Sequence, residues 1–248
     1  MWELLQEDSR PELNDPVLVV SLSTSIQQYR ALYSHARELS KYMLKKMKFE
    51  KLATLYSSSM PPLVMISEDG VIRLSSTCFY RHPGRRDLVL LAGDASPLEH
   101  EYQYCKTVID YAKSLKIQEM VSIGTRWTED AGSPTATPKV KGFATDGEGV
   151  NNLQKLGVEV IRDEPAPYFA SLIVALAQRN GLRGYKLSVD HGEPIPHPRS
   201  VIELLGTLKK MAGFELPTAE LARLATKMAE NIESVAEEQP PRRPGIYG

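Results

Sequence analysis

Runs of apolar residues alternate with segments of helical periodicity along most of this chain. The runs at 16–22, 87–93 and 119–124 are apolar almost throughout, which is typical of strands that are buried on both faces of a sheet. Between these runs, apolar residues recur every three or four positions, as they do in amphipathic helices. Because parallel strands are joined by crossover helices, the alternation predicts an α/β fold with a mainly parallel sheet and helices on both faces.

Local signals place individual elements within this pattern. Asp69-Gly70 lies between two short apolar stretches and predicts a β-hairpin, because Asp-Gly supplies the positive φ angles of a tight turn. Residues 96–99, Ser-Pro-Leu-Glu, form a capping box and predict that a helix begins there. Residues 125–145 are rich in Gly, Pro, Ser and Thr, so we expect a long loop with one short strand at 140–144. Further helices are expected after residue 25 and at 150–156, 168–178, 198–213 and 217–235, and further strands at 51–57, 158–161 and 183–190.

Composition and charge restrict the class of protein. With 42% hydrophobic and 25% charged residues among 248, the chain has a globular composition, and we expect a single domain over 1–238. The formal net charge of -1 gives no electrostatic reason to bind nucleic acid or an anionic membrane surface. Only Cys78 and Cys105 are present, which excludes a disulfide framework. Acidic residues interrupt the opening stretch 1–20, so we expect no targeting segment and a cytoplasmic protein.

Polar residues follow several of the predicted strands. Asp94, Thr125, Arg126 and Asp190 lie where the carboxyl ends of parallel strands meet, which is the usual place of a ligand crevice in α/β folds. These residues could bind a small polar molecule. The alternative is that they cap the helices that begin there, which is the more common role of short polar side chains.

Motifs for the common chemistries of α/β folds are missing from the sequence. It contains no Gly-Lys-Ser/Thr phosphate loop and no Gly-x-Ser-x-Gly elbow, and the Gly-Glu-Gly segment at 147–149 lacks the third glycine of a nucleotide-binding loop. His191, Glu193 and His197 could supply three metal ligands, but they lie among Pro and Gly residues without regular spacing. We therefore predict no catalytic residues, no metal site and no cofactor.

The last residues, 239–248 (QPPRRPGIYG), differ in kind from the predicted domain. Proline and arginine exclude a helix and favour extended, solvated backbone, so this tail should act as a tether that reaches roughly 30 Å. It presents Ile246, Tyr247 and Gly248 with a terminal carboxylate. An apolar side chain, a phenol that combines ring packing with one hydrogen bond, and a carboxylate together suit a pocket that contains a cation.

Four stretches carry a resemblance to a known family. They are DLVLLAG at 87–93, MVSIG at 120–124, PRSVIELLG at 198–206 and GFELPTAEL at 213–221. In this order and spacing they resemble the proteasome assembly chaperone 2 family, especially its archaeal members, over about residues 17–236. The resemblance implies an α/β three-layer sandwich similar to nucleoside phosphorylases.

The C-terminal tripeptide is similar to the HbYX motif (a hydrophobic residue, tyrosine, any residue), by which activators dock into the α-ring of the proteasome core particle. With the family resemblance, it implies a noncatalytic, ATP-independent assembly chaperone or activator that binds α-subunits through Ile246, Tyr247 and Gly248. We also expect a homo-oligomer, because several weak tails bind more tightly together and because the helices at 168–178 and 221–235 carry surplus apolar surface. The alternative is an enzyme acting on a nucleoside-like or other small polar ligand in the crevice, with an activity that survives loss of the tail.

Overall fold

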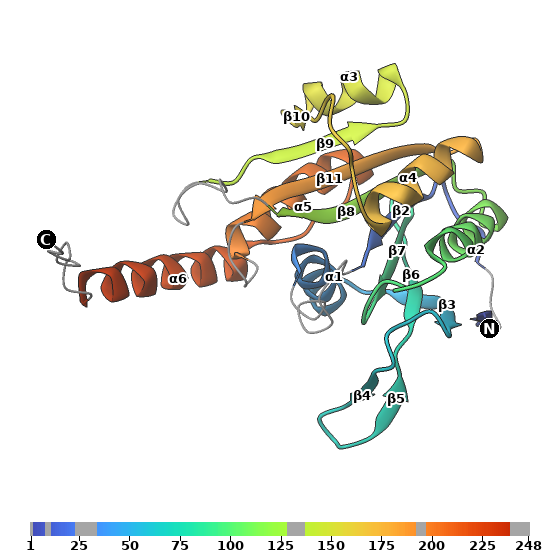
Figure 1. Cartoon of the computed structure of the whole chain (residues 1–248), viewed down its shortest axis with the longest axis horizontal. Helices are drawn as coiled ribbons and strands as arrows, with labels where there is room; N and C mark the ends of the chain where they lie inside the picture. Colours follow the sequence, from blue (N-terminus) through green and yellow to red (C-terminus); the bar gives the residue numbers. More distant parts are fainter. Residues whose placement is uncertain (1, 8–10, 23–33, 128–136, 192–196, 239–248) are drawn as a thin grey trace, which may run out of the picture.

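A nine-stranded sheet runs through the described part of the chain (Figure 1). The computed structural model describes residues 2–7, 11–22, 34–127, 137–191 and 197–238. The strands of this sheet are β1 (Trp2–Gln6), β2 (Val17–Ser21), β3 (Glu50–Ser57), β6 (Thr77–His82), β7 (Leu88–Gly93), β8 (Glu119–Trp127), β9 (Val140–Ala144), β10 (Glu159–Val160) and β11 (Arg183–His191). Their order is β1-β3-β6-β7-β2-β8-β11-β9-β10, and β4 (Val64–Ile66) and β5 (Ile72–Leu74) form a separate hairpin.

The centre of the large sheet is parallel, and antiparallel pairs lie on both sides of it. Strands β7, β2, β8 and β11 are parallel neighbours in that order. Strands β1, β3 and β6 join β7 through antiparallel pairs, and β9 pairs antiparallel with β11. The four central strands therefore end at one common edge of the sheet, which we call the carboxyl edge.

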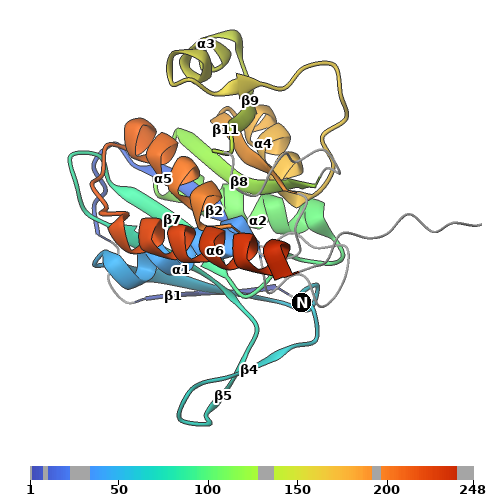
Figure 2. The same cartoon turned by 90° about the vertical axis from the view of Figure 1, so that its left-hand side faces the viewer.

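Helices cover both faces of the sheet and complete three layers (Figures 1 and 2). The helices are α1 (His35–Lys46), α2 (Glu101–Ser114), α3 (Gly147–Lys155), α4 (Phe169–Arg179), α5 (Pro198–Ala212) and α6 (Ala219–Glu238). The buried residues of α1 and α5 belong to one hydrophobic cluster and those of α2 and α4 to a second, on opposite faces of the sheet. The predicted three-layer α/β sandwich is confirmed.

Strand β2 shows why the apolar runs in the sequence are central strands. Val17 and Val19 belong to the cluster under α1 and α5, whereas Leu18 and Val20 belong to the cluster under α2 and α4. All four are at most 1% exposed. Because successive side chains of a strand point to opposite faces, only an uninterrupted apolar run satisfies both helix layers.

Two helix starts differ from the sequence prediction. Residues 96–99 are not helical, because the Leu98 amide donates to the Ser59 carbonyl at 2.8 Å and the chain is held there by the loop after β3. Helix α2 begins only after His100, which has a φ of 53°. The helix predicted at 150–156 begins earlier, because the Gly-Glu-Gly segment at 147–149 is the first turn of α3. Asp146 caps this turn, and its Oδ1 accepts from the Gly149 amide at 2.6 Å.

The strand predictions are partly wrong as well. The sequence pattern missed β1 and β6, which extend the sheet on its antiparallel side. The expected loop over 125–145 begins too early, because β8 continues to Trp127, and residues 128–136 lie outside the described part. The short strand expected at 140–144 is confirmed as β9, and the hairpin is confirmed with Gly70 at a φ of 81°.

Candidate functional site

The carboxyl edge carries the four polar residues that the sequence places in a crevice, but the structure does not bring them together. Thr125 Oγ1 lies 3.2 Å from Nδ1 of His35, on the face that α1 covers. Arg126, the next residue of β8, points to the opposite face and pairs with Asp190 of β11. Asp94 follows β7, two strands away from β8, and binds a different partner.

Arg126 and Asp190 belong to a network of ion pairs. Arg126 Nε lies 3.0 Å from Asp190 Oδ1, without the alignment of a hydrogen bond, and Arg126 also pairs with Glu164. Lys141 Nζ of β9 lies 2.8 Å from Asp190 Oδ2 and 3.2 Å from Glu159 Oε1, and above all the hydrogen bond to Asp190 raises the pKa of Lys141. Each charge in the network has a partner, so the network joins β8, β11 and β9 instead of leaving a free ligand group.

Asp94 holds the β4–β5 hairpin against the large sheet. Its carboxylate is almost fully buried and accepts two hydrogen bonds from Arg73 of β5, at 2.6 Å and 2.8 Å. The Ser76 amide donates to the same carboxylate at 3.2 Å. The hydrogen bond to Asp94 raises the pKa of Arg73, as expected for a bidentate pair. Asp94 therefore has a structural role that occupies both of its oxygens.

Replacing Asp94 by alanine should release the hairpin from the sheet. Arg73 would lose both hydrogen bonds, and we expect a loss of about 2 kcal/mol in the free energy of unfolding. Limited proteolysis followed by mass spectrometry should then show faster cleavage within 61–76. Glu38→Ala, which removes only an exposed pair with Lys41, is the matched control. Equal cleavage of the two variants would contradict the anchoring role.

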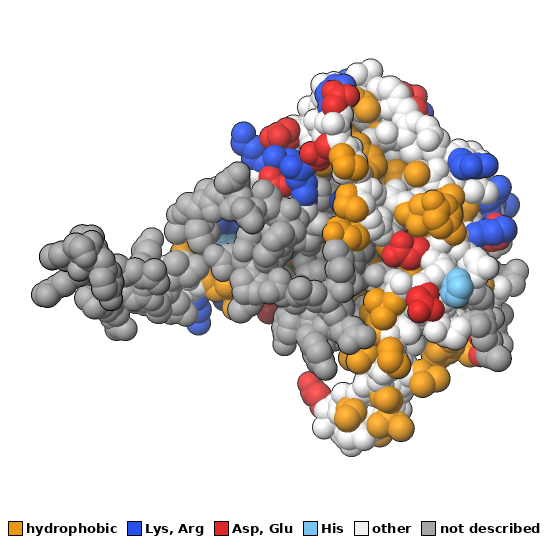
Figure 3. Space-filling model, viewed as in Figure 1, with side chains coloured by type: hydrophobic (Ala, Val, Ile, Leu, Met, Phe, Trp, Pro, Cys, Tyr) orange, Lys and Arg blue, Asp and Glu red, His pale blue; other side chains and the backbone are white. Residues whose placement is uncertain are grey.

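The hairpin presents one apolar face to solvent. The register pairs Val64 with Leu74 and Ile66 with Ile72, and these four side chains are 55–71% exposed. Arg73 alternates to the other face, toward the large sheet. Figure 3 shows the apolar atoms gathered on this projecting part of the molecule. Exposed aliphatic clusters of this kind mark protein contacts, and the sequence predicted the hairpin but not its exposure.

The two helices from which self-association was expected differ in their surroundings. Helix α4 buries Phe169, Ile173 and Val174 in the core under α2, so its apolar surface is already covered. Helix α6 contacts α5, and Leu221 near its start is buried, whereas Leu224 is 46% exposed. Figure 1 shows α6 extending away from the body of the molecule. The tail follows the last residue of this projecting helix.

Of the three residues considered as metal ligands, the structure describes the side chain of His197 alone. His197 caps α5, because its Nδ1 accepts from the Arg199 amide at 3.2 Å, and burial above all lowers the pKa of His197. Glu193 and the side chain of His191 lie outside the described residues. Within the described ranges, no group of three or more His, Cys, Asp or Glu residues could hold a metal ion.

None of the helices searched there has the length and apolar character that crossing a membrane requires.

The partner-binding residues predicted from the sequence, Ile246, Tyr247 and Gly248, also lie outside the described residues. Their role stays a prediction. The structure does describe α6, after which the tail begins, and it describes the domain to which the tail is attached.

The topology and the three layers define an α/β three-layer sandwich. Comparison with known proteins gives the family. The chain belongs to the PAC2 family, whose sequence model matches residues 36–236. This confirms the resemblance to the proteasome assembly chaperone 2 family. No curated protein matches the chain in sequence.

Solved structures with the same fold extend over almost the whole chain. Pyrococcus furiosus PbaB, an archaeal proteasome activator, is 19% identical with a TM-score of 0.80, over 95% of this chain and 98% of that one. Pyrococcus furiosus PbaA, an archaeal homolog of proteasome-assembly chaperone, is 18% identical with a TM-score of 0.72, over 96% and 97%. The Mycobacterium tuberculosis proteasome-assembly chaperone homologue Rv2125 is 17% identical with a TM-score of 0.73, over 90% and 97%. At these identities the comparisons show a shared fold.

Proposed function

We propose that this protein is a noncatalytic, ATP-independent assembly chaperone or activator of the proteasome core particle, which docks its C-terminal tail into the α-ring. The observation that carries the proposal is a PAC2-family domain followed by a tail that ends in Ile246, Tyr247 and Gly248. Two proteins of the same fold are an archaeal proteasome activator and an archaeal homolog of proteasome-assembly chaperone. The proposed partners are the α-subunits of the core particle, in the cytoplasm.

The chemistry of the tail supports docking at a pocket between two subunits. The Ile246 side chain supplies apolar area, the Tyr247 ring packs while its hydroxyl makes one hydrogen bond, and a carboxylate at Gly248 pairs with a cation. An extended Pro-rich segment loses little conformational entropy when it binds. Helix α6 adds reach, because it projects from the body before the tail begins (Figure 1).

We also propose that the protein acts as a homo-oligomer, because one tripeptide binds weakly and linked copies gain effective concentration. The exposed apolar face of the β4–β5 hairpin supports self-association, since such a face is seldom left in contact with water. Sedimentation should show an assembly larger than the 27.7 kDa chain at micromolar concentration. A stable monomer would contradict this part of the proposal.

The enzyme alternative has less support from the described residues. Asp94 is occupied by Arg73, and Asp190 by Arg126 and Lys141, so these two carboxylates do not converge on one crevice. The buried thiol of Cys105 is no stronger candidate, because desolvation raises its pKa and disfavours the reactive thiolate.

The experiment that tests the proposal compares the binding of two chains to purified core particle. One is the full chain and the other ends at Gln239, which removes 240–248 and leaves the domain. We expect the full chain to be retained by immobilised core particle and the shortened chain to be lost. Retention of both to the same extent would remove the main support for tail docking.

A further inference from the structure

A buried lysine of β11 lies on the face of the sheet that α4 covers, and it takes no part in the ion pairs of Arg126, Asp190 and Lys141. Lys186 is in the middle of β11 and is only 6% exposed. Within the described part of the chain, its ammonium group has neither a hydrogen-bond partner nor an ion-pair partner. A buried cation without a counter-ion is costly, so this position calls for an explanation.

The neighbours of Lys186 leave room for its ammonium group and add a second unsatisfied polar group. Ser122 is opposite Lys186 in the register of β8 and β11, and its Oγ is buried without a partner in the described residues. Two positions further along β8, Gly124 has no side chain. A Cβ atom at Gly124 would lie 2.8 Å from Lys186 Nζ and 3.3 Å from the Cβ of Ala170 in α4. The ammonium group therefore lies close to the first turn of α4.

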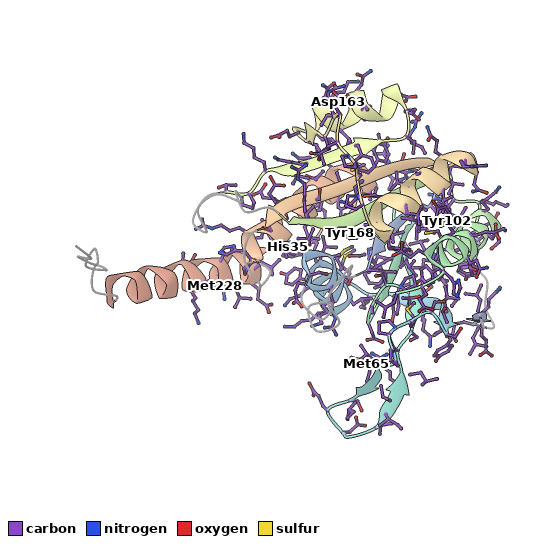
Figure 4. The ribbon with its side chains drawn as sticks, viewed as in Figure 1. His35, Met65, Tyr102, Asp163, Tyr168 and Met228 are labelled. Atoms are coloured by element: carbon purple, nitrogen blue, oxygen red, sulfur yellow. The ribbon has the colours of Figure 1, made fainter. Side chains whose placement is uncertain are left out.

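This first turn has free donors and no negative charge. Tyr168, labelled in Figure 4 where α4 begins, has a φ of 74° and gives no side-chain cap. The first turn contains no acidic residue, and the amides of Phe169 and Ala170 donate to no described residue. The N-terminus of an 11-residue helix carries a partial positive charge, which favours an anion and repels an ammonium group.

The charged side chains around Lys186 do not neutralise it. Desolvation, and to a smaller extent the positive charge of Arg126, lower the pKa of Lys186 to about 8. On the same face of the sheet, Asp190 is bound by Arg126 and Lys141, and Glu164 pairs with Arg126. The ammonium group of Lys186 and the N-terminus of α4 are therefore left without a compensating carboxylate among the described residues, whereas Arg126 is paired.

We propose that Lys186, Ser122 and the N-terminal amides of α4 form a binding site for a small oxyanion of the phosphate class. A phosphate group accepts hydrogen bonds from an ammonium, a hydroxyl and helix-terminal amides at the same time, and its negative charge compensates the lysine. The anion can be free phosphate or the phosphate group of a small ester. This inference does not depend on the proposed proteasome function, since the site lies in the domain and not in the tail.

Titration calorimetry of the full chain with inorganic phosphate tests the site, at constant ionic strength set with chloride. We expect saturable binding, with Lys186→Met weakening it by about tenfold or more. Methionine keeps the apolar stem and removes the buried charge, so this variant should fold. Lys113→Met, which changes an exposed lysine of α2, should bind like the original chain. Glycerol phosphate in place of phosphate distinguishes the two sources, because tighter binding of the ester identifies an esterified ligand.

A second measurement does not need a variant. Acylation of the full chain near pH 8, read by mass spectrometry, should modify Lys186 in chloride and be slowed about tenfold by saturating phosphate. The exposed Lys113 should react equally in both buffers. Absence of saturable phosphate binding, equal binding by the chain with Lys186→Met, or unprotected acylation of Lys186 would each overturn the proposal.

Discussion

Replacing Tyr247 by alanine should abolish the stimulation of peptide hydrolysis by the proteasome core particle and leave the thermal midpoint of unfolding unchanged. The change removes a ring and one hydrogen bond at an anchor, a loss of about 2 kcal/mol or more per tail. Because several tails would act together in the proposed homo-oligomer, the loss in avidity should exceed the loss at one site. Stability should not change, since the tail follows the last helix of the domain.

The paired control for this prediction keeps every side chain. One residue added after Gly248 moves the terminal carboxylate away from its cation, so this chain should also lose stimulation while Ile246 and Tyr247 stay in place. Peptide hydrolysis by purified core particle and thermal melting are measured for both variants. Unchanged stimulation by both would show that the tripeptide is not the functional site.

Replacing Asp87 by alanine should strongly destabilise the domain. Asp87 is 1% exposed at the start of β7 and accepts hydrogen bonds from Arg81 at 3.0 Å, from the Gly84 amide at 3.1 Å and from the Asn14 amide at 3.2 Å. Alanine would leave the largely buried Arg81 without its main partner. We expect a loss of roughly 4 kcal/mol in the free energy of unfolding.

Urea unfolding followed by circular dichroism measures this loss. Asp110→Ala is the matched control, because Asp110 pairs with Lys106 on the exposed side of α2, and removing such a pair costs about 0.5 kcal/mol. Asp87→Asn keeps the shape and should fall between the two. If Asp87→Ala were no more destabilising than Asp110→Ala, the hydrogen bonds of Asp87 would not be holding β7 in place.

The sequence predicted the central strands well because burial on both faces requires an uninterrupted run of apolar residues. Strands β2, β7 and β8 each face helices on both sides, and apolar runs at 16–22, 87–93 and 119–124 follow from that. Strands β1 and β6 have no such apolar run and were not predicted. They lie on the antiparallel side of the sheet, where exposed positions of β1 and half-buried positions of β6 admit polar residues. The helix predicted to begin at 96–99 begins only at Glu101, because a tertiary hydrogen bond from Leu98 to Ser59 overrides the local signal.

The candidate sites were likewise predicted only in part. The sequence placed Asp94 and Asp190 at strand ends correctly, but it could not show that Arg73, far earlier in the chain, would occupy Asp94. Lys186 was missed although a signal was present. In the strand Arg183–His191, a lysine stands at an alternating position that a buried strand normally fills with an apolar residue. The tail motif could be proposed from sequence alone, because the proposed docking depends on residue type and on position at the terminus.

The most direct test of the central claim is a cryo-electron microscopy reconstruction of the proteasome core particle with this protein bound in the absence of nucleotide. The proposed function predicts density for residues 246–248 in pockets between neighbouring α-subunits, with the carboxylate of Gly248 beside a cationic side chain. A reconstruction in which the protein contacts the core particle only through its domain, with those pockets empty, would contradict it.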